Sequence, residues 1–257
     1  MPQSKKNAKQ KQEHTASRVR VSTSKTTGKP TEKAKSEELR PGASYPTPQM
    51  ALELLHARYP NVACALEYHA DPWRLLVMAR LSAQCTDARV NMVTPALFAR
   101  FPDAQAFASA EIAEIEEMIK STGFFHNKAK NIKSCAQDIC EKFGGELPNT
   151  MEELLSLAGV GRKTANLVLG DAFHKPSYVI DTHAIRLCGR IGLTQNTDPI
   201  KIESDLRTIL PPNEAKPEES GNFCHRLVLH GRAVCPARKP KCESCTISEL
   251  GLCDYAL

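Results

Sequence analysis

The spacing of apolar residues predicts helices from about residue 47 to the end of the chain. The clearest run falls at i, i+3, i+4, i+7, i+8 and i+11, where the chain has Ile132, Cys135, Ala136, Ile139, Cys140 and Phe143. A second helical face is formed by Ile112, Ile115, Met118 and Ile119. No alternation with a period of two, which is typical of strands, competes with these patterns. The sequence therefore predicts an all-α fold of about ten helices without internal repeats.

Helix-start signals support this pattern. A capping residue followed by a proline occurs at Thr47-Pro48, Asp71-Pro72 and Asp198-Pro199. Thr86 or Asp87 can cap a helix that runs to about Arg100. Thr150 and Glu153 have the spacing of a capping box, in which each side chain satisfies the other's backbone amide.

Charge divides the chain unevenly. The formal net charge is +5 over 257 residues, but residues 1–45 carry 11 Lys and Arg against 4 Asp and Glu. This tail has almost no large apolar residues, so it is predicted to be disordered. Two interpretations stay open: a solubilising segment, or a basic arm that adds non-specific attraction to DNA. The remainder is slightly acidic, which excludes a uniformly basic protein that coats DNA.

Composition also restricts the location of the protein. No stretch approaches the ~20 apolar residues of a membrane span, and the start lacks the apolar core of a signal peptide. We expect a cytoplasmic, nucleoid-associated protein without membrane contact. In that setting, the ten cysteines are expected to be reduced thiols or metal ligands rather than disulfides.

One motif lies between two predicted helices, the first from Thr150 to about Leu157 and the second from near Gly161. It reads Leu157-Ala-Gly-Val-Gly-Arg-Lys-Thr-Ala-Asn166. Glycines let a backbone approach a partner closely, and the unpaired amides of a helix N-terminus can hold a phosphate. Such contacts grip nucleic acid without reading bases. Gly-x-Gly alone would indicate an ordinary turn, but the Arg-Lys-Thr-Ala that follows favours a phosphate clamp.

Lys163 falls in the first turn of the second of these helices. The positive end of the helix dipole disfavours a cation there and favours the neutral amine that a Schiff-base nucleophile requires. The alternative is a lysine that contacts a phosphate, and the sequence does not separate the two.

Four cysteines crowd the C-terminal region. Cys235, Cys242, Cys245 and Cys253 are separated by six, two and seven residues. This density indicates a metal centre rather than scattered core thiols. Either tetrahedral zinc or a four-iron cluster would accept four thiolates, and the spacing does not decide between them. The other six cysteines are expected to be buried core thiols: Cys64, Cys85, Cys135, Cys140, Cys188 and Cys224.

Taken in order, these motifs resemble the endonuclease III family, the iron–sulfur DNA glycosylase/AP lyases of the helix-hairpin-helix superfamily. The resemblance covers about residues 47–255 and includes three further motifs: Leu81-Ser-Ala-Gln-Cys-Thr-Asp87, Val179-Ile-Asp-Thr-His-Ala-Ile-Arg186 and Leu229-His-Gly-Arg232. It implies two helical lobes. A six-helix barrel with the helix-hairpin-helix would span about residues 65–175. Residues 46–64 and 176–257 would form a domain with a [4Fe–4S] cluster on the four cysteines.

The resemblance also implies a reaction. Lys163 would attack the sugar C1′ of a flipped nucleotide, expel an oxidised pyrimidine and form a Schiff base, after which β-elimination would cleave the strand 3′ to the abasic site. Asp181 would assist lysine activation. The expected partner is double-stranded DNA containing damaged pyrimidines or abasic sites, bound by a monomer. The cluster would be structural. The predicted DNA-binding residues are Gln84, Gly159, Val160, Gly161, Arg162 and His183, with Gln84 and His183 filling the gap left by flipping.

Plainer interpretations stay open for three of these residues. Asp181 could be merely a helix N-cap, His183 a helix-face histidine, and Gln84 a polar residue at a helix end. Lys163 separates the chain from related adenine glycosylases, which usually lack a lysine there and carry an extra C-terminal domain. A pyrimidine-dimer glycosylase, a non-catalytic DNA-binding module and a zinc-stabilised structural protein remain alternatives.

The chain departs from the family pattern at three places. The last gap in the cysteine motif is seven residues instead of five, Ala158 replaces a proline before the hairpin, and Phe124 stands where a leucine often wedges into the opposite strand.

Overall fold

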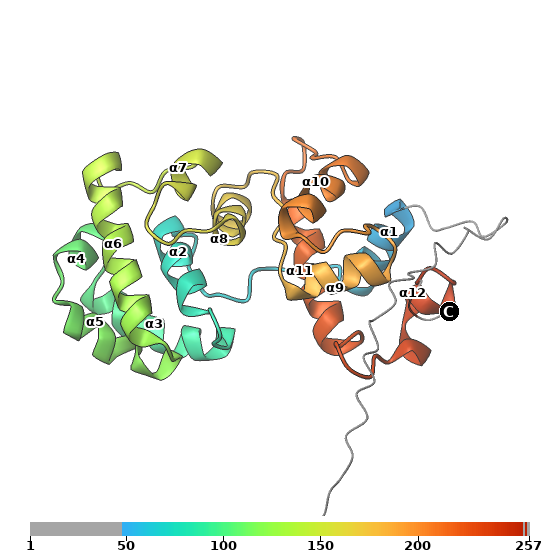
Figure 1. Ribbon diagram of the computed structural model, residues 1–257, viewed down its shortest axis with the longest axis horizontal. Coiled ribbons are helices and arrows are strands. Elements are labelled where there is room, and N and C mark those ends of the chain that lie inside the picture. The colour runs from blue at the N-terminus through green and yellow to red at the C-terminus, as the bar shows by residue number, and fades with distance from the viewer. Residues whose placement is uncertain (1–47, 254, 256–257) are drawn as a thin grey trace, which may run out of the picture. The chain divides into compact units, whose positions relative to one another are not determined.

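The computed structural model describes residues 48–253 and Tyr255, and this part of the chain is helical without a β-strand (Figure 1). The all-α prediction is therefore confirmed. The predicted disordered tail, residues 1–45, lies outside the described residues. Within the described part the α-helices are α1 Pro48–Arg58, α2 Pro72–Leu81, α3 Asp87–Arg100, α4 Ala104–Ser109, α5 Ile112–Ile119, α6 Phe125–Phe143, α7 Met151–Leu155, α8 Arg162–Leu167, α9 Thr182–Arg190, α10 Pro199–Ile209, α11 Glu218–Ala233 and α12 Thr246–Glu249. Three short helical turns join them: η1 Lys120–Thr122, η2 Val168–Ala172 and η3 Cys242–Ser244.

Among the described residues, helix starts fall where the capping signals predict them, whereas the predicted cap Thr47 lies outside the described residues. Asp71 accepts a hydrogen bond from the Arg74 amide at 3.1 Å, and Asp198 accepts from two amides of the first turn of α10 at 3.0 Å. Thr86, rather than Asp87, caps α3. The predicted N-cap at Thr150 is confirmed, because its hydroxyl oxygen accepts from the Glu153 amide at 3.3 Å, but the capping box forms only in part: the Glu153 carboxylate accepts from the Thr150 hydroxyl instead of the Thr150 amide.

The helix before the hairpin is shorter than predicted. It ends at Leu155 rather than near Leu157, with Ser156 as its C-cap. The physical reason is local, because the Ser156 amide donates to the carbonyls of Glu152 and Glu153, which tightens the last turn.

A first hydrophobic cluster is built by α2 to α8. Its aromatic centre is Phe107, which contacts Trp73 edge-on at a centroid distance of 5.5 Å and Phe101 at 5.1 Å. The face predicted for α6 points into it, since Ile132 and Ile139 are fully buried.

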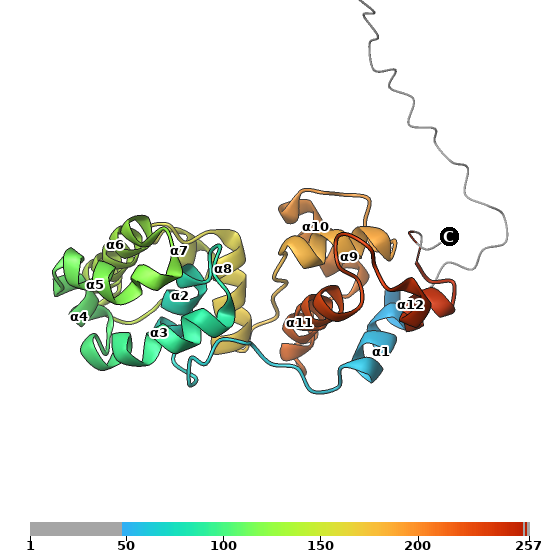
Figure 2. The same ribbon diagram turned by 90° about the horizontal axis from the view of Figure 1, so that it is seen from below.

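A second hydrophobic cluster joins both ends of the described chain. The N-terminal helix α1 buries Ala51 and Leu55 among side chains of α9 to α12, including Phe223 and Leu227 of α11. Figure 2 shows α1 beside α11 and α12, in agreement with the contacts between these elements. The two clusters favour the predicted two-lobe division, whose residue boundaries stay a prediction. Over the described residues, no helix combines the length and apolar character needed to cross a membrane.

Candidate active site and nucleic-acid interface

The hairpin between α7 and α8 is shaped by a glycine in the left-handed region. Gly159 has φ +67°, and its carbonyl accepts a hydrogen bond from the Arg80 guanidinium of α2. A Cβ atom at this position would lie 2.5 Å from Arg80 Nη2. The adjacent Ala158 amide donates to Asp138 at 2.8 Å. Glycine is therefore required at position 159 both by its backbone angle and by the close approach of Arg80.

The start of α8 offers open donors. Its N-cap, Gly161, provides no side-chain hydrogen bond, so the first amides of the helix are left without that partner. The Val160 amide, in contrast, donates to the Leu157 carbonyl at 3.1 Å, and the Val160 side chain is buried. The Val160 amide is therefore used inside the turn, and fewer backbone amides of the predicted phosphate clamp are free than the sequence suggested.

Lys163 and Asp181 line one pocket of about 150 Å³. Lys163 is exposed in the first turn of α8, and Asp181 immediately precedes α9. Apolar groups form much of the wall, with a few polar residues among them, which is the usual character of a ligand site. The polar side chains that share this pocket with Lys163 and Asp181 are Ser82, Asp87, His225 and Arg232.

Asp181 fills two positions at once. Its Oδ1 accepts the backbone amides of His183 and Ala184, both at 2.8 Å, so the N-cap interpretation is confirmed. The same carboxylate lines the pocket with Lys163. A cap that uses one carboxylate oxygen fixes the side chain and leaves the other oxygen for chemistry, so the two interpretations are compatible.

His183, in the first turn of α9, is half-buried against α11. Its Nδ1 lies 3.0 Å from Arg186 Nη2, and a Cβ on Gly231 of α11 would fall 2.5 Å from the same nitrogen. Burial lowers the pKa of His183, Asp181 opposes this effect and Arg186 adds to it. Burial against α11 thus favours the neutral form of the imidazole.

Two exposed turns carry side chains in strained positions. Gln84 has φ +54° between α2 and α3, and Phe124 has φ +49° at the start of α6. Both angles are uncommon for residues with a side chain. Phe124 is 64% exposed. These turns present an amide and an aromatic ring to the surroundings.

One buried lysine, Lys128, connects the two turns. Its Nζ donates to the carbonyls of Leu81 and Thr122, each at 2.8 Å, and burial lowers its pKa. The sequence analysis did not single this residue out. A signal was present, because Lys128 lies one turn before Ile132 on the apolar stripe of α6.

Arg162 forms an ion pair with another part of the protein. Its guanidinium forms a bidentate pair with Glu203 of α10, with distances of 2.6 and 3.0 Å. Asn166 also donates to this carboxylate at 2.9 Å. The predicted DNA contact by the Arg162 side chain therefore competes with an existing ion pair, and the pairing ties α8 to α10.

Three of the four cysteines of the predicted metal centre contact Arg190 or His230, and the fourth, Cys242, is hydrogen-bonded to Cys245 through the backbone. Arg190 donates to the sulfur of Cys235 at 3.1 Å, and its carbonyl accepts from Cys253 at 3.3 Å. The sulfur of Cys245 lies 3.5 Å from Nε2 of His230, while its amide bonds the Cys242 carbonyl. No group of three or more His, Cys, Asp or Glu side chains among the described residues is arranged as a metal site. The candidate ligands are all thiols, and they come from one C-terminal segment.

The other cysteines divide into two kinds. Cys135, Cys188 and Cys224 are buried, as expected, and burial raises the pKa of Cys135 and Cys188 to about 12. Cys64, Cys85 and Cys140 are only partly buried, because they lie at the edges of the cores.

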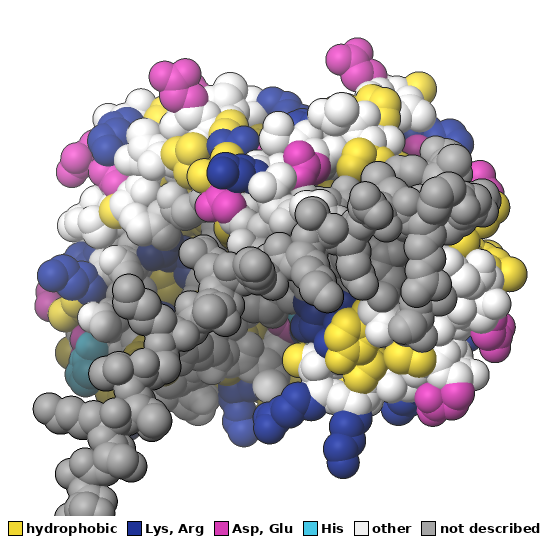
Figure 3. Space-filling view, turned by 45° about the vertical axis from the view of Figure 1, so that its right-hand side comes forward, with side chains coloured by type: hydrophobic (Ala, Val, Ile, Leu, Met, Phe, Trp, Pro, Cys, Tyr) yellow, Lys and Arg dark blue, Asp and Glu magenta, His cyan; other side chains and the backbone are white. Residues whose placement is uncertain are grey.

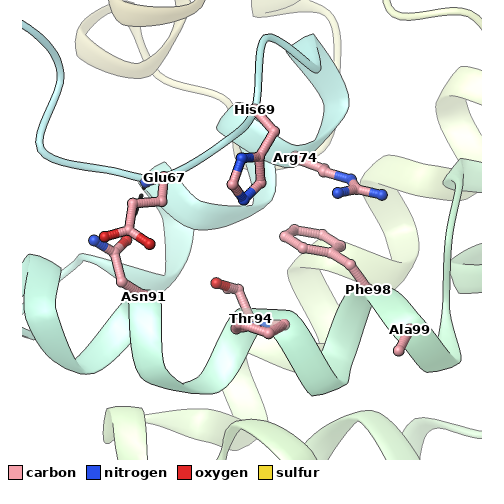
Figure 4. Close-up of a pocket in the computed structure, with 8 residues that line it drawn as sticks. Glu67, His69, Arg74, Asn91, Thr94, Phe98 and Ala99 are labelled. Carbon is pink, nitrogen blue, oxygen red and sulfur yellow. Dashed lines mark hydrogen bonds between the residues drawn. The ribbon is translucent and has the colours of Figure 1, made fainter.

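A larger hollow lies elsewhere, against α3. It has a volume of about 330 Å³, and Figure 4 shows Glu67 and His69 facing Asn91, Thr94 and Phe98 across it. None of the predicted site residues lines this hollow. The smaller pocket is the better candidate because it brings the predicted nucleophile and its carboxylate together.

Basic side chains gather on part of the surface. In Figure 3, several Lys and Arg side chains lie along the lower edge of the visible face, and others alternate with Asp and Glu side chains over the rest of it. A local basic edge can attract a polyanion even where the net charge of the folded part is slightly negative.

The fold and the lysine-bearing hairpin define a class of DNA repair proteins. Residues 77–212 match the family described as "HhH-GPD superfamily base excision DNA repair protein". Endonuclease III from Synechocystis sp. is 53% identical over 200 residues, which are 77% of this chain and 89% of that protein. Endonuclease III from Haemophilus influenzae is 41% identical over 204 residues, which are 79% and 93% of the two chains.

A solved structure agrees with these relatives. A trapped endonuclease III–DNA covalent intermediate superimposes with a TM-score of 0.74 at 36% identity, covering 81% of this chain and 94% of that one. The chain belongs to the endonuclease III family, and it is an enzyme of base excision DNA repair.

Proposed function

We propose that this chain is a bifunctional DNA glycosylase and abasic-site lyase that removes oxidised pyrimidines, with Lys163 as its nucleophile. The observation that carries the proposal is that Lys163 and Asp181 line one pocket beside the uncapped start of α8. A nucleophilic lysine and a carboxylate able to take its proton are the two groups that Schiff-base chemistry at a sugar carbon requires.

The proposed reaction begins with a nucleotide turned out of the duplex into this pocket. Flipping costs a few kcal/mol and costs least for damaged or poorly paired bases. The neutral amine of Lys163 attacks C1′, the bond from C1′ to the base breaks, and the base leaves with the bonding electrons. Asp181 takes the proton that the amine releases. The sugar ring then opens to a Schiff base on Lys163.

Strand cleavage follows from the Schiff base. The imine acidifies the C2′ hydrogen, and removal of this proton expels the 3′ phosphate by β-elimination. Hydrolysis of the imine then releases Lys163. The trapped covalent complex of an endonuclease III with DNA supports a covalent step of this kind.

The DNA-binding surface is proposed to combine the hairpin with two exposed turns. Gly159 and Gly161 allow the DNA backbone to approach the open amides at the start of α8. Gln84 and Phe124 are exposed on strained turns, as side chains that enter the duplex would have to be. His183 is proposed to support this region from its position against Gly231. We further propose that the protein acts on damaged duplex DNA as a monomer in the cytoplasm.

Cys235, Cys242, Cys245 and Cys253 are proposed to hold a [4Fe–4S] cluster. The support is the chemistry of the set: four cysteines come from one segment in a chain of this family, and three of them contact Arg190 or His230. Such a cluster would contribute folding energy to the segment and order the exposed Arg238, Lys239 and Lys241.

Borohydride trapping tests the lysine assignment. Wild-type protein incubated with a duplex containing dihydrouracil and sodium borohydride should form a covalent adduct, because reduction fixes the Schiff base. Lys163→Ala should form none, and Lys175→Ala, an exposed lysine of the same lobe, should trap like wild type. An undiminished adduct with Lys163→Ala would refute the assignment.

A further inference from the structure

An aspartate and a histidine form a hydrogen-bonded pair at the wall of the active-site pocket. Nε2 of His225, on α11, lies 2.9 and 3.1 Å from the two carboxylate oxygens of Asp171. Both side chains are mostly buried, at 16% and 15% exposure. Neither residue belongs to the motifs of the sequence analysis.

Asp171 occupies an unusual backbone position. It lies in η2, a π-helical turn that continues α8, where the Phe173 amide donates to the Val168 carbonyl at 3.2 Å. Such wide turns are rare and are frequent at functional sites, because they redirect a side chain from the helical repeat. The Tyr68 hydroxyl further fixes this turn by donating to the Asp171 carbonyl at 2.7 Å.

His225 lines the pocket that contains Lys163 and Asp181. Of the other charged side chains that line this pocket besides Lys163 and Asp181, Asp87 and Arg232 pair with each other at 3.0 Å. Leu167 and Val179 contribute hydrocarbon, and burial beside Asp171 raises the pKa of the Cys64 thiol to about 12. Because Asp87 and Arg232 are paired, His225 and Ser82 are the remaining polar side chains of the pocket, besides Lys163 and Asp181, that can form a hydrogen bond with a base.

One of the two imidazole nitrogens of His225 is available for a hydrogen bond with a ligand. An ionised carboxylate only accepts hydrogen bonds, so Nε2 of His225 carries a proton and donates it to Asp171. Within the described part of the chain, Nδ1 has no hydrogen-bond partner. In the neutral ring this nitrogen is an acceptor, matched to a ring N–H such as damaged thymines and uracils present.

We propose that His225, oriented by Asp171, recognises the flipped base by accepting a hydrogen bond from its ring N–H. The inference rests on the proposed function and extends it from the sugar to the base. Lys163 and Asp181 act at C1′, which every nucleotide has, so selection among bases must come from other groups in the pocket. His225 is a base-recognition residue in this account, and Asp171 is the residue that positions it.

The test separates base release from strand cleavage. His225→Phe keeps an aromatic ring and removes both nitrogens, and the double variant His225→Phe with Asp171→Leu avoids an unpaired buried carboxylate. For both, kcat/KM for release of dihydrouracil should fall about 10-fold or more, the effect of losing one well-formed hydrogen bond in the transition state. Cleavage at a pre-formed abasic site, where no base is present, should change less than about 2-fold.

His56→Phe is the matched control. It makes the same change at an exposed histidine of α1 that does not line the pocket, so both activities should stay near wild type. If base release and abasic-site cleavage fall in parallel, the pair is only a structural tie between η2 and α11, and the proposal is overturned. It is also overturned if neither activity changes. Wild-type protein that neither releases dihydrouracil nor cleaves abasic sites would instead refute the proposed function itself.

Discussion

At the scale of single residues, Gly231 decides how the imidazole of His183 is held. Gly231 is buried within α11, and the ring of His183 and the guanidinium of Arg186 pack directly over it. The position has ordinary helical geometry, so glycine is needed for space and not for its backbone freedom.

We therefore predict that Gly231→Ala destabilises the protein. The added methyl group would lie 2.5 Å from His183 Nδ1 and 2.8 Å from Arg186 Nη2, so both side chains must shift. Overpacking of this kind costs about 1–3 kcal/mol, measurable by urea unfolding. Gly189→Ala on α9 is the control, because nothing lies within 4 Å of its Cβ and alanine is the better helix former. A Gly231→Ala protein as stable as wild type would show that the His183 ring moves freely.

The C-terminal segment from Cys235 to Cys253 has little regular structure of its own and depends on contacts with the rest of the fold. Its regular structure is limited to the short η3 and α12. It is fastened to the fold mainly through Arg190, which also donates to the carbonyls of Pro236 and Ala237, both at 2.9 Å. A segment with so little helix gains from a bound cluster, because thiolate–metal bonds replace missing packing.

We predict that the purified protein is brown and contains iron, and that Cys242→Ser lowers its iron content and its soluble yield. The measurements are visible absorption, which reports the thiolate-to-iron charge-transfer bands, and analysis of the metal content. Cys140→Ser, at a partly buried cysteine of α6, should retain wild-type iron. A colourless wild-type protein with one zinc per chain would exclude the iron–sulfur cluster.

In the molecule as a whole, Glu203 links the two hydrophobic clusters. Its side chain is 3% exposed and accepts hydrogen bonds from Arg162 and Asn166 of α8, while Arg207 lies 3.1 Å away on its own helix. Burial acts to raise the pKa of Glu203, but the hydrogen bonds and positive charges outweigh burial and lower it below the ordinary 4.5.

This lowered pKa gives stability a pH dependence. A carboxyl group with a lower pKa in the folded state stabilises the fold above its unfolded pKa and loses this effect as the pH falls through its folded pKa. Glu203→Gln should therefore lower the free energy of unfolding by about 2 kcal/mol at pH 7. The difference from wild type should narrow as the pH falls below 4.5.

The control for this prediction is an exposed ion pair. Glu117 pairs with Lys120 on the surface of α5, and Glu117→Gln should change stability by less than about 0.5 kcal/mol. Urea unfolding at several pH values measures both variants. A Glu203→Gln deficit that stays constant with pH would mean that shape, and not charge, stabilises this contact.

The sequence by itself determined what depends on near neighbours. Apolar spacing and capping residues predicted where α2, α3 and α10 begin, because their hydrogen bonds close within four residues. The motifs also placed Lys163 and Asp181 among the candidates, because a family motif is defined by residue types and their order along the chain.

Only the tertiary structure decided which side chains meet. Arg162 pairs with Glu203 across 41 residues, an ion pair that the sequence did not indicate, while its predicted DNA contact stays a prediction. His225 meets Asp171 across 54 residues through a π-helical turn that no periodic pattern marks. The physical reason is the range of the interactions: a cap or an amphipathic stripe is written in adjacent positions, whereas a buried polar group finds its partner only when the helices have packed.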